Sequence, residues 1–123
     1  MSRRIVLDTN CLVSSLPRNG KYHRVWQDFF EKKYTLCYTN EILTEYEEIL
    51  TQKMGKMIAQ NIIKAIIARP NTMKLDPHFQ FRLIEQDVDD NKFVDCAIVA
   101  NAEYIVTEDK HFKVLETIDF PKV

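Results

Sequence analysis

Glycine is scarce in this chain, with 2 residues among 123, and this scarcity excludes the glycine-rich loop with which many nucleotide-binding proteins hold phosphates. Cysteine is nearly as rare. The 3 cysteines are an odd number, form no Cys-x-x-Cys pair and have no histidine at ligand spacing. We therefore expect neither a disulfide framework nor a zinc site, and we interpret Cys11, Cys37 and Cys96 as small buried apolar residues.

Long apolar runs and an excess of one charge are also lacking. No run approaches the roughly 18 residues of a membrane span, and the N-terminus has no apolar signal-peptide core. We expect a cytoplasmic protein with no membrane association. The net charge of -1 gives no overall attraction to nucleic acid, so such binding would need a local patch. With 46% hydrophobic residues, the length fits a single domain over residues 1–123.

Two short apolar runs, one near each end of the chain, each stop on an acidic residue. They are Ile5-Val6-Leu7-Asp8-Thr9-Asn10 and Tyr104-Ile105-Val106-Thr107-Glu108-Asp109. Runs of this length, rich in β-branched residues, are typical of strands buried on both faces of a parallel sheet. Ligand sites in such sheets lie beyond the carboxyl ends of the strands. If the two strands are neighbours, Asp8 and Asp109 face one crevice.

Amphipathic helices alternate with further strands between these two runs. We expect additional strands at Tyr34–Tyr38 and Thr72–Leu75, and helices at Cys11–Leu16, Tyr22–Phe30, Ile42–Leu50 with Thr39 as its cap, Met54–Ala68 and Phe93–Ala100. Strands joined by helices through short links indicate right-handed crossovers. The fold class that follows is α/β, a three-layer α/β/α domain with a mainly parallel central sheet.

Acidic residues from several of these elements converge at one edge of such a sheet. They are Asp8 and Asp109 at strand ends, Glu45 on a helix, and Asp90 and Asp95 at the start and in the interior of another helix. Two like charges about 4 Å apart repel by roughly 4 kcal/mol at an effective dielectric of 20, so the cluster must take up protons or hold a cation. Oxygen donors without histidine or cysteine favour Mg²⁺ or Mn²⁺. Such a site suits phosphodiester hydrolysis without a covalent nucleophile.

Polar and basic residues near these acids are candidates for supporting roles. Asn10 and Thr107 could orient a ligand carboxylate, and Lys110 could contact a phosphate. Lys53 and Lys56 are weaker candidates for an RNA-binding rim, which would position the backbone without reading sequence. A lysine series of this kind is also typical of a solvated helix edge.

Each acid has an ordinary structural interpretation as well. An aspartate after a strand, such as Asp8, often only closes a turn or caps a helix, and Asp90 could merely cap the helix that follows it. A glutamate on a helix, such as Glu45, is usually solvated. Asp95 is harder to explain in this way, because its apolar neighbours would make burial of an isolated acid costly. The second strand-end acid, Asp109, favours the site.

Four segments together resemble a PIN domain, in particular the bacterial group of ribonuclease toxins from toxin-antitoxin pairs. They are the hydrophobic-Asp-Thr-Asn opening, the helix of Glu45, Asp90-Asn91-Lys92-Phe93, and Val106-Thr107-Glu108-Asp109. The resemblance covers essentially the whole chain. It implies a three-layer α/β nuclease that cleaves RNA with Mg²⁺ or Mn²⁺, and it suggests a cognate antitoxin as partner and a homodimer.

Carried over by position, the family's first acid falls on Asp8, its helix acid on Glu45 and its last acid on Asp109. The third acid has two candidates. Asp90 has the right distance before Asp109, whereas Asp95 has the Asp-x-x-Ile-x-Ala neighbourhood found in many members. We favour Asp90 and keep Asp95 as an additional ligand.

Two other functions compete with a metal-dependent endoribonuclease. A receiver-like signalling domain has a similar length, a parallel sheet and strand-end aspartates. However, receivers accept phosphate on an aspartate at the end of the middle strand, and this chain has Thr39-Asn40 where its second strand ends. The other possibility is a catalytically inactive PIN fold that binds RNA or protein. The intact set of acids argues against inactivity.

Overall fold

The computed structural model describes residues 3–20, 22–76, 91–102 and 104–107. Its helices and strands alternate along the chain. In order they are β1 (Arg3–Leu7), α1 (Thr9–Ser15), α2 (His23–Phe30), β2 (Tyr34–Thr39), α3 (Asn40–Met54), α4 (Lys56–Ala68), β3 (Thr72–Leu75), α5 (Asn91–Ala100) and β4 (Tyr104–Val106). The predicted strand at Thr72–Leu75 is confirmed.

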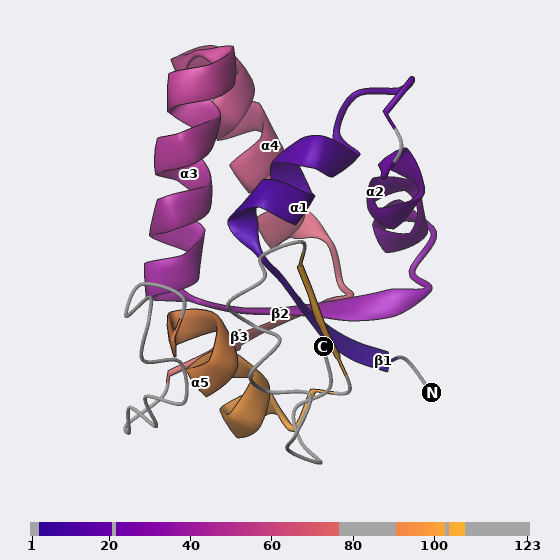
Figure 1. Cartoon of the computed structure of the whole chain (residues 1–123), viewed down its shortest axis with the longest axis vertical. Coiled ribbons are helices and arrows are strands. Elements are labelled where there is room, and N and C mark those ends of the chain that lie inside the picture. Colours follow the sequence, from indigo (N-terminus) through magenta and orange to yellow (C-terminus); the bar gives the residue numbers. More distant parts are fainter. Residues whose placement is uncertain (1–2, 21, 77–90, 103, 108–123) are drawn as a thin grey trace.

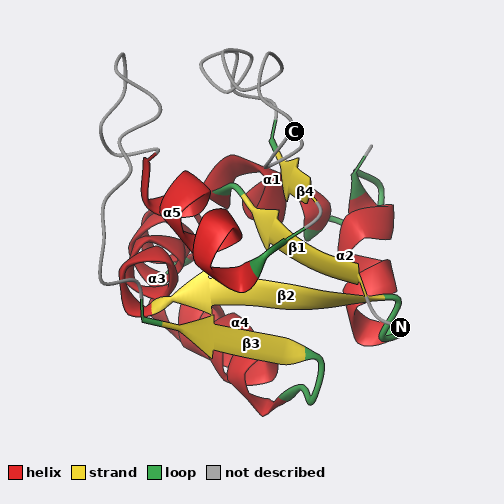
Figure 2. Cartoon of the chain, turned by 90° about the horizontal axis from the view of Figure 1, so that it is seen from below, coloured by secondary structure: helices red, strands yellow, loops and turns green. Residues whose placement is uncertain are grey.

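The four strands form one sheet in the order β3-β2-β1-β4, and each neighbouring pair is parallel (Figure 2). Strand β1 therefore lies between β2 and β4, and Leu7 pairs with Val106 in register. The chain first builds the sheet outward through β2 and β3 and then returns to the other side of β1. Ligand sites lie at such switch points, beyond the carboxyl ends of the strands. Asp8 and Thr107 follow the two strands at this point.

Helices cover both faces of the sheet (Figure 1). Helices α1 to α4 lie on one face and α5 lies on the other, where it contacts all four strands. The three-layer α/β arrangement and the parallel sheet that the sequence predicted are confirmed.

The helix boundaries differ from the predictions because residues at the helix ends, and not the apolar pattern, set where each helix begins. Helix α1 begins at Thr9 and not at Cys11, because Asp8 is the last residue with extended backbone. Helix α5 begins at Asn91 and not at Phe93. Gly55, with a φ of 90°, separates α3 from α4, so the second of these helices starts at Lys56 and not at Met54.

Thr39 caps α3 as predicted, since its hydroxyl accepts a hydrogen bond from the Ile42 amide at 3.1 Å. This cap starts α3 directly at the end of β2. The helix therefore rises from the same edge of the sheet at which β1 and β4 end, and it carries Glu45 on its second turn.

The core lies between the sheet and the helices on both faces. Strand residues such as Leu36 and Ile105, and helix residues such as Tyr46 and Phe93, are fully buried. All three cysteines are buried, as expected. Within the described residues, none of the helices is long and apolar enough to cross a membrane.

Candidate active site at the strand ends

Asp8 lies at the end of β1 with 5% of its surface exposed, and its backbone and side chain have different partners. Its amide donates to the Val106 carbonyl at 3.0 Å, which extends the pairing of β1 with β4 by one residue. Its carbonyl accepts from the Leu12 amide and so starts α1. The carboxylate makes no capping hydrogen bond to α1. Instead, its Oδ2 accepts a hydrogen bond from the Thr107 hydroxyl at 2.9 Å. The interpretation of Asp8 as a side-chain cap is therefore wrong.

Glu45 connects three helices through its carboxylate. The Thr9 hydroxyl, on α1, donates a hydrogen bond to Oε2. The Lys92 ammonium, on α5, lies 2.8 Å from Oε1. Since Thr9 follows Asp8 directly, these contacts place the Glu45 carboxylate beside the end of β1. The side chain is 28% exposed, which argues against a fully solvated surface glutamate.

Tyr46 fixes the spacing between α3 and the end of β1. Its side chain is fully buried, and its hydroxyl donates to the Leu7 carbonyl at 2.6 Å. Burial raises the pKa of this hydroxyl well above its ordinary value, and the nearby carboxylates of Asp8 and Glu45 raise it further. Tyr46 therefore remains a neutral hydrogen-bond donor at physiological pH. Leu7 precedes Asp8 and Tyr46 follows Glu45 in the sequence. This hydrogen bond therefore fixes the position of Glu45 relative to Asp8.

Helix α5 supplies a cation and a further acid to the same region. The Lys92 side chain is only 8% exposed, and its ammonium lies 5.2 Å from the centre of the Phe93 ring. Asp95 is 6% exposed. It lies three residues after Lys92, and residues at this spacing are neighbours on a helix surface. Asp95 is thus buried on the helix that contacts β1, β2, β3 and β4.

A cleft of about 510 Å³ lies beside these residues. Its described lining comes from α3 and α5 and consists of Glu41, Thr44, Glu45, Glu48, Ile49 and Lys92. Three glutamates against one lysine make this described part of the cleft acidic. Such a cleft attracts cations and repels phosphate, so contacts to a nucleic-acid backbone would need other residues.

The structure places the predicted site residues in three groups. Asp8, Glu45 and Thr107 belong to one connected network, with Asp95 one helical turn from its lysine. Asn10 is exposed on α1, and Lys53 and Lys56 are exposed at the end of α3 and the start of α4. Lys53 follows Glu45 by eight residues, about 12 Å along a helix, so these lysines lie far from the acids. Asp90, Asp109 and Lys110 lie outside the described residues.

The donor chemistry of this network fits a hard divalent cation. Asp8 and Asp95 are buried carboxylates, and Asp8 is oriented by a hydroxyl, as metal-binding carboxylates commonly are. Over the described part of the chain, however, no three acidic, histidine or cysteine side chains are grouped closely enough to hold a metal by themselves. A complete site therefore needs ligands beyond these residues, and the sequence offers Asp90 and Asp109.

Three residues of the network were not predicted to have a role at the site: Thr9, Tyr46 and Lys92. Each makes its contact to a residue far away in the sequence, so periodicity could not reveal it. Only Lys92 left a signal. Lys92 directly precedes the stretch Phe93–Ala97, in which every residue is buried, and a lysine beside such a stretch is partly covered by the core.

A three-layer α/β domain with a parallel sheet and a buried aspartate at the end of its central strand has the architecture of a PIN-type fold. The sequence matches the PIN domain family over residues 4–111, and the chain belongs to this family. No curated protein matches the chain in sequence. The receiver-like alternative is not supported by the family match.

Two solved structures have a similar fold. One is VapBC2 from Rickettsia felis, bound to a DNA fragment from its promoter. It has a TM-score of 0.64 and 18% identity, and the alignment covers 89% of this chain and 91% of the other. The second is VapC20 of Mycobacterium tuberculosis, described as a toxin that cleaves the sarcin-ricin loop. It has a TM-score of 0.63 and 15% identity over 89% and 92% of the two chains. At these identities the similarity establishes the fold.

Proposed function

We propose that this PIN domain is a metal-dependent endoribonuclease that hydrolyses RNA phosphodiester bonds at the strand-end acids. The observation that carries the proposal is the position of Asp8. It is a buried carboxylate at the switch point of the sheet, it is oriented by Thr107, and it does not serve as a side-chain cap for α1. Burying a carboxylate is costly unless its charge is compensated, and a cation bound at the strand ends would compensate it.

Several acidic residues together would coordinate Mg²⁺ or Mn²⁺. Asp8, Asp95, Asp90 and Asp109 are the proposed ligands, with Glu45 at the edge of the same group. A divalent ion bound there supplies Lewis acidity toward the phosphate and lowers the pKa of a water molecule. Thr107 keeps the Asp8 carboxylate in one orientation, and Tyr46 keeps α3 against β1.

The biological setting we propose is a toxin-antitoxin pair. The two similar structures are a VapBC complex and a toxin named for cleavage of the sarcin-ricin loop. By analogy, the substrate would be RNA and the partner a cognate antitoxin. A homodimer and a cytoplasmic location complete this proposal.

The experiment incubates the purified protein with RNA and Mn²⁺, with and without EDTA, beside Asp8→Asn and Asp28→Asn. The second variant is a matched control, because Asp28 is an aspartate in surface ion pairs of α2. We expect EDTA to abolish cleavage. Asp8→Asn should lower the cleavage rate at least about 100-fold, because the loss of one group that stabilises the transition state commonly has an effect of this size. Asp28→Asn should leave the rate within about twofold of the wild type. Cleavage that persists in EDTA or in Asp8→Asn contradicts the mechanism.

The same experiment tests the inactive binding module. Asp8→Asn should keep its melting temperature in EDTA, because the asparagine side-chain oxygen can still accept the Thr107 hydrogen bond and the change removes one negative charge from an acidic group. A wild-type protein that binds RNA but never cleaves it, with any divalent ion, would support the binding module instead.

A further inference from the structure

Lys92 is the part of the site that a metal-binding function does not call for. An ammonium group cannot be a metal ligand, and it repels a divalent cation. Yet the Lys92 side chain is 92% buried, and its Nζ lies 2.8 Å from Glu45 Oε1. Burying a cation costs several kcal/mol unless a well-placed anion compensates for it, so the structure must gain from this pair.

Glu45 is oriented by the protein alone. Lys92 engages one carboxylate oxygen from α5, and Thr9 engages the other from α1. The Phe93 ring lies beside the ammonium and limits its movement. These contacts come from two elements on opposite faces of the sheet, so the carboxylate is held in place before any metal is present.

The charge of Lys92 also offsets repulsion among the acidic residues of the site. The Thr9 hydroxyl brings Glu45 next to the residue that follows Asp8, and Glu41 and Glu48 line the cleft together with Glu45. Without a cation, mutual repulsion of these groups would oppose folding. A lysine placed against the central glutamate reduces that repulsion.

We propose that Lys92 is the resident counter-cation of this acidic site. In the metal-free protein its ammonium balances and positions Glu45. When a divalent ion binds, it takes over part of that carboxylate's charge, and the stabilising effect of Lys92 falls. The inference rests on the proposed function, because it assumes that a divalent ion binds next to Glu45. It makes Lys92 a positioning residue and not a phosphate contact.

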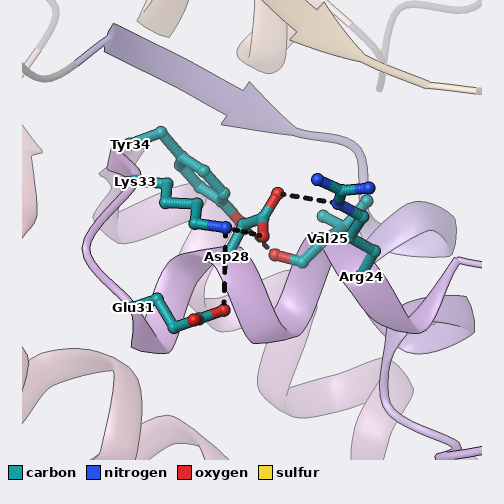
Figure 3. Close-up of polar contacts among 6 residues, drawn as sticks. All are labelled: Arg24, Val25, Asp28, Glu31, Lys33 and Tyr34. Carbon is teal, nitrogen blue, oxygen red and sulfur yellow. Dashed lines mark hydrogen bonds and ion pairs between the residues drawn. The ribbon is translucent and has the colours of Figure 1, made fainter.

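The test compares melting temperatures in EDTA and in excess Mn²⁺ for four proteins: the wild type, Lys92→Met, the double variant Glu45→Gln/Lys92→Met, and Lys33→Met. Methionine keeps the length of the lysine stem without its charge. Lys33 is the matched control, because it forms ion pairs with Asp28 and Glu31 but is 53% exposed (Figure 3). The double variant removes both charges, so it reports on the pair even if Lys92→Met folds poorly.

In EDTA we expect Lys92→Met to melt roughly 10 °C below the wild type, as for a partly buried pair that loses one partner. Excess Mn²⁺ should reduce that deficit to less than half, because the ion then neutralises Glu45. The double variant should recover most of the stability in EDTA and gain less from Mn²⁺ than Lys92→Met. Lys33→Met should stay within roughly 2 °C of the wild type in both conditions.

Two results would overturn the inference, and they differ. If Mn²⁺ raises the wild-type melting temperature but leaves the Lys92→Met deficit unchanged, Lys92 does not share Glu45 with the ion, whereas the proposed metal site survives. If Mn²⁺ does not stabilise even the wild type, the metal site itself is refuted and the inference falls with it.

Discussion

Two groups of paired charges in this molecule have anions of similar exposure but differ in the burial of their cations, and the difference shows what each group does. The outer group surrounds Asp28 on α2, which pairs with Arg24 at 3.7 Å and Lys33 at 3.5 Å (Figure 3). The two cations are 82% and 53% exposed. In the inner group, Glu45 pairs with Lys92 at 2.8 Å, and that lysine is 8% exposed.

The outer pairs are short-range in sequence and solvated, so they contribute little to stability, on the order of 0–1 kcal/mol each. The inner pair joins α3 to α5 and lies next to Asp8. Its members are costly to bury separately and are held together by the fold. The exposed ion pairs of α2 therefore have little effect on the fold, whereas the inner pair is part of the site.

The largest contrast should come from removing the anion of each group. Glu45→Ala leaves Lys92 with one partner fewer in a buried position, and we expect a loss of about 2 kcal/mol of unfolding free energy, discounted from the range for fully buried pairs because Glu45 is partly exposed. Asp28→Ala should cost less than about 1 kcal/mol. Urea unfolding of both variants measures this. Equal losses would remove the distinction between the two groups.

Burial of a thiol in the sheet should also make the protein sensitive to alkali. Burial raises the pKa of the Cys37 thiol to about 11, while nearby Arg4 and a backbone hydrogen bond lower it less. The folded state therefore keeps a proton that the unfolded state releases above pH 9, so stability is complete below that pH and falls between pH 9 and 11. The loss amounts to about 2 kcal/mol.

Cys37→Ala tests this assignment. The variant starts less stable, because it leaves a small cavity in the core, but its unfolding free energy should fall less steeply between pH 9 and 11. An unchanged slope would assign the alkaline transition to other groups.

The Tyr46 hydrogen bond should matter less than either charge effect. Tyr46→Phe removes the donor to the Leu7 carbonyl while it keeps the ring in the core, so we expect a loss of about 1 kcal/mol. RNA cleavage should fall more than this stability loss explains, because the bond sets the distance between α3 and Asp8. Wild-type turnover in this variant would show that the site does not depend on that spacing.

Salt should have the smallest effect, and it should act on the outer group. Raising the ionic strength to 1 M shortens the Debye length to about 3 Å and screens the exposed pairs of Lys33. The difference in stability between wild type and Lys33→Met, below about 0.5 kcal/mol at low salt, should then vanish. A salt-insensitive difference would mean that Lys33 is less solvated than its 53% exposure indicates.

The sheet and most of its helices could be predicted from the sequence because they depend on local patterns. The apolar run before Asp8 and the cap at Thr39 are examples, and both act within a few residues. The choice of Asp8 and Glu45 followed from strand order and family resemblance. The structure connects these two acids through Thr9.

The pairing of Lys92 with Glu45 could not be predicted in this way. It depends on how α5 packs across the sheet from α3, and no repeat or spacing in the sequence records that contact. The same holds for Tyr46, which follows the apolar pattern of α3 but uses its hydroxyl on another element. Long-range polar contacts of this kind need the fold before they can be seen.

The central claim is that the buried Asp8 beyond β1 binds a divalent cation together with the other predicted acids. It is tested most directly by a crystal structure of the protein soaked in Mn²⁺, with anomalous scattering used to locate the ion. We predict a peak within coordination distance of the Asp8 carboxylate. Crystals with ordered Asp8, Glu45 and Asp95 side chains and no peak near Asp8 at saturating Mn²⁺ would contradict the claim.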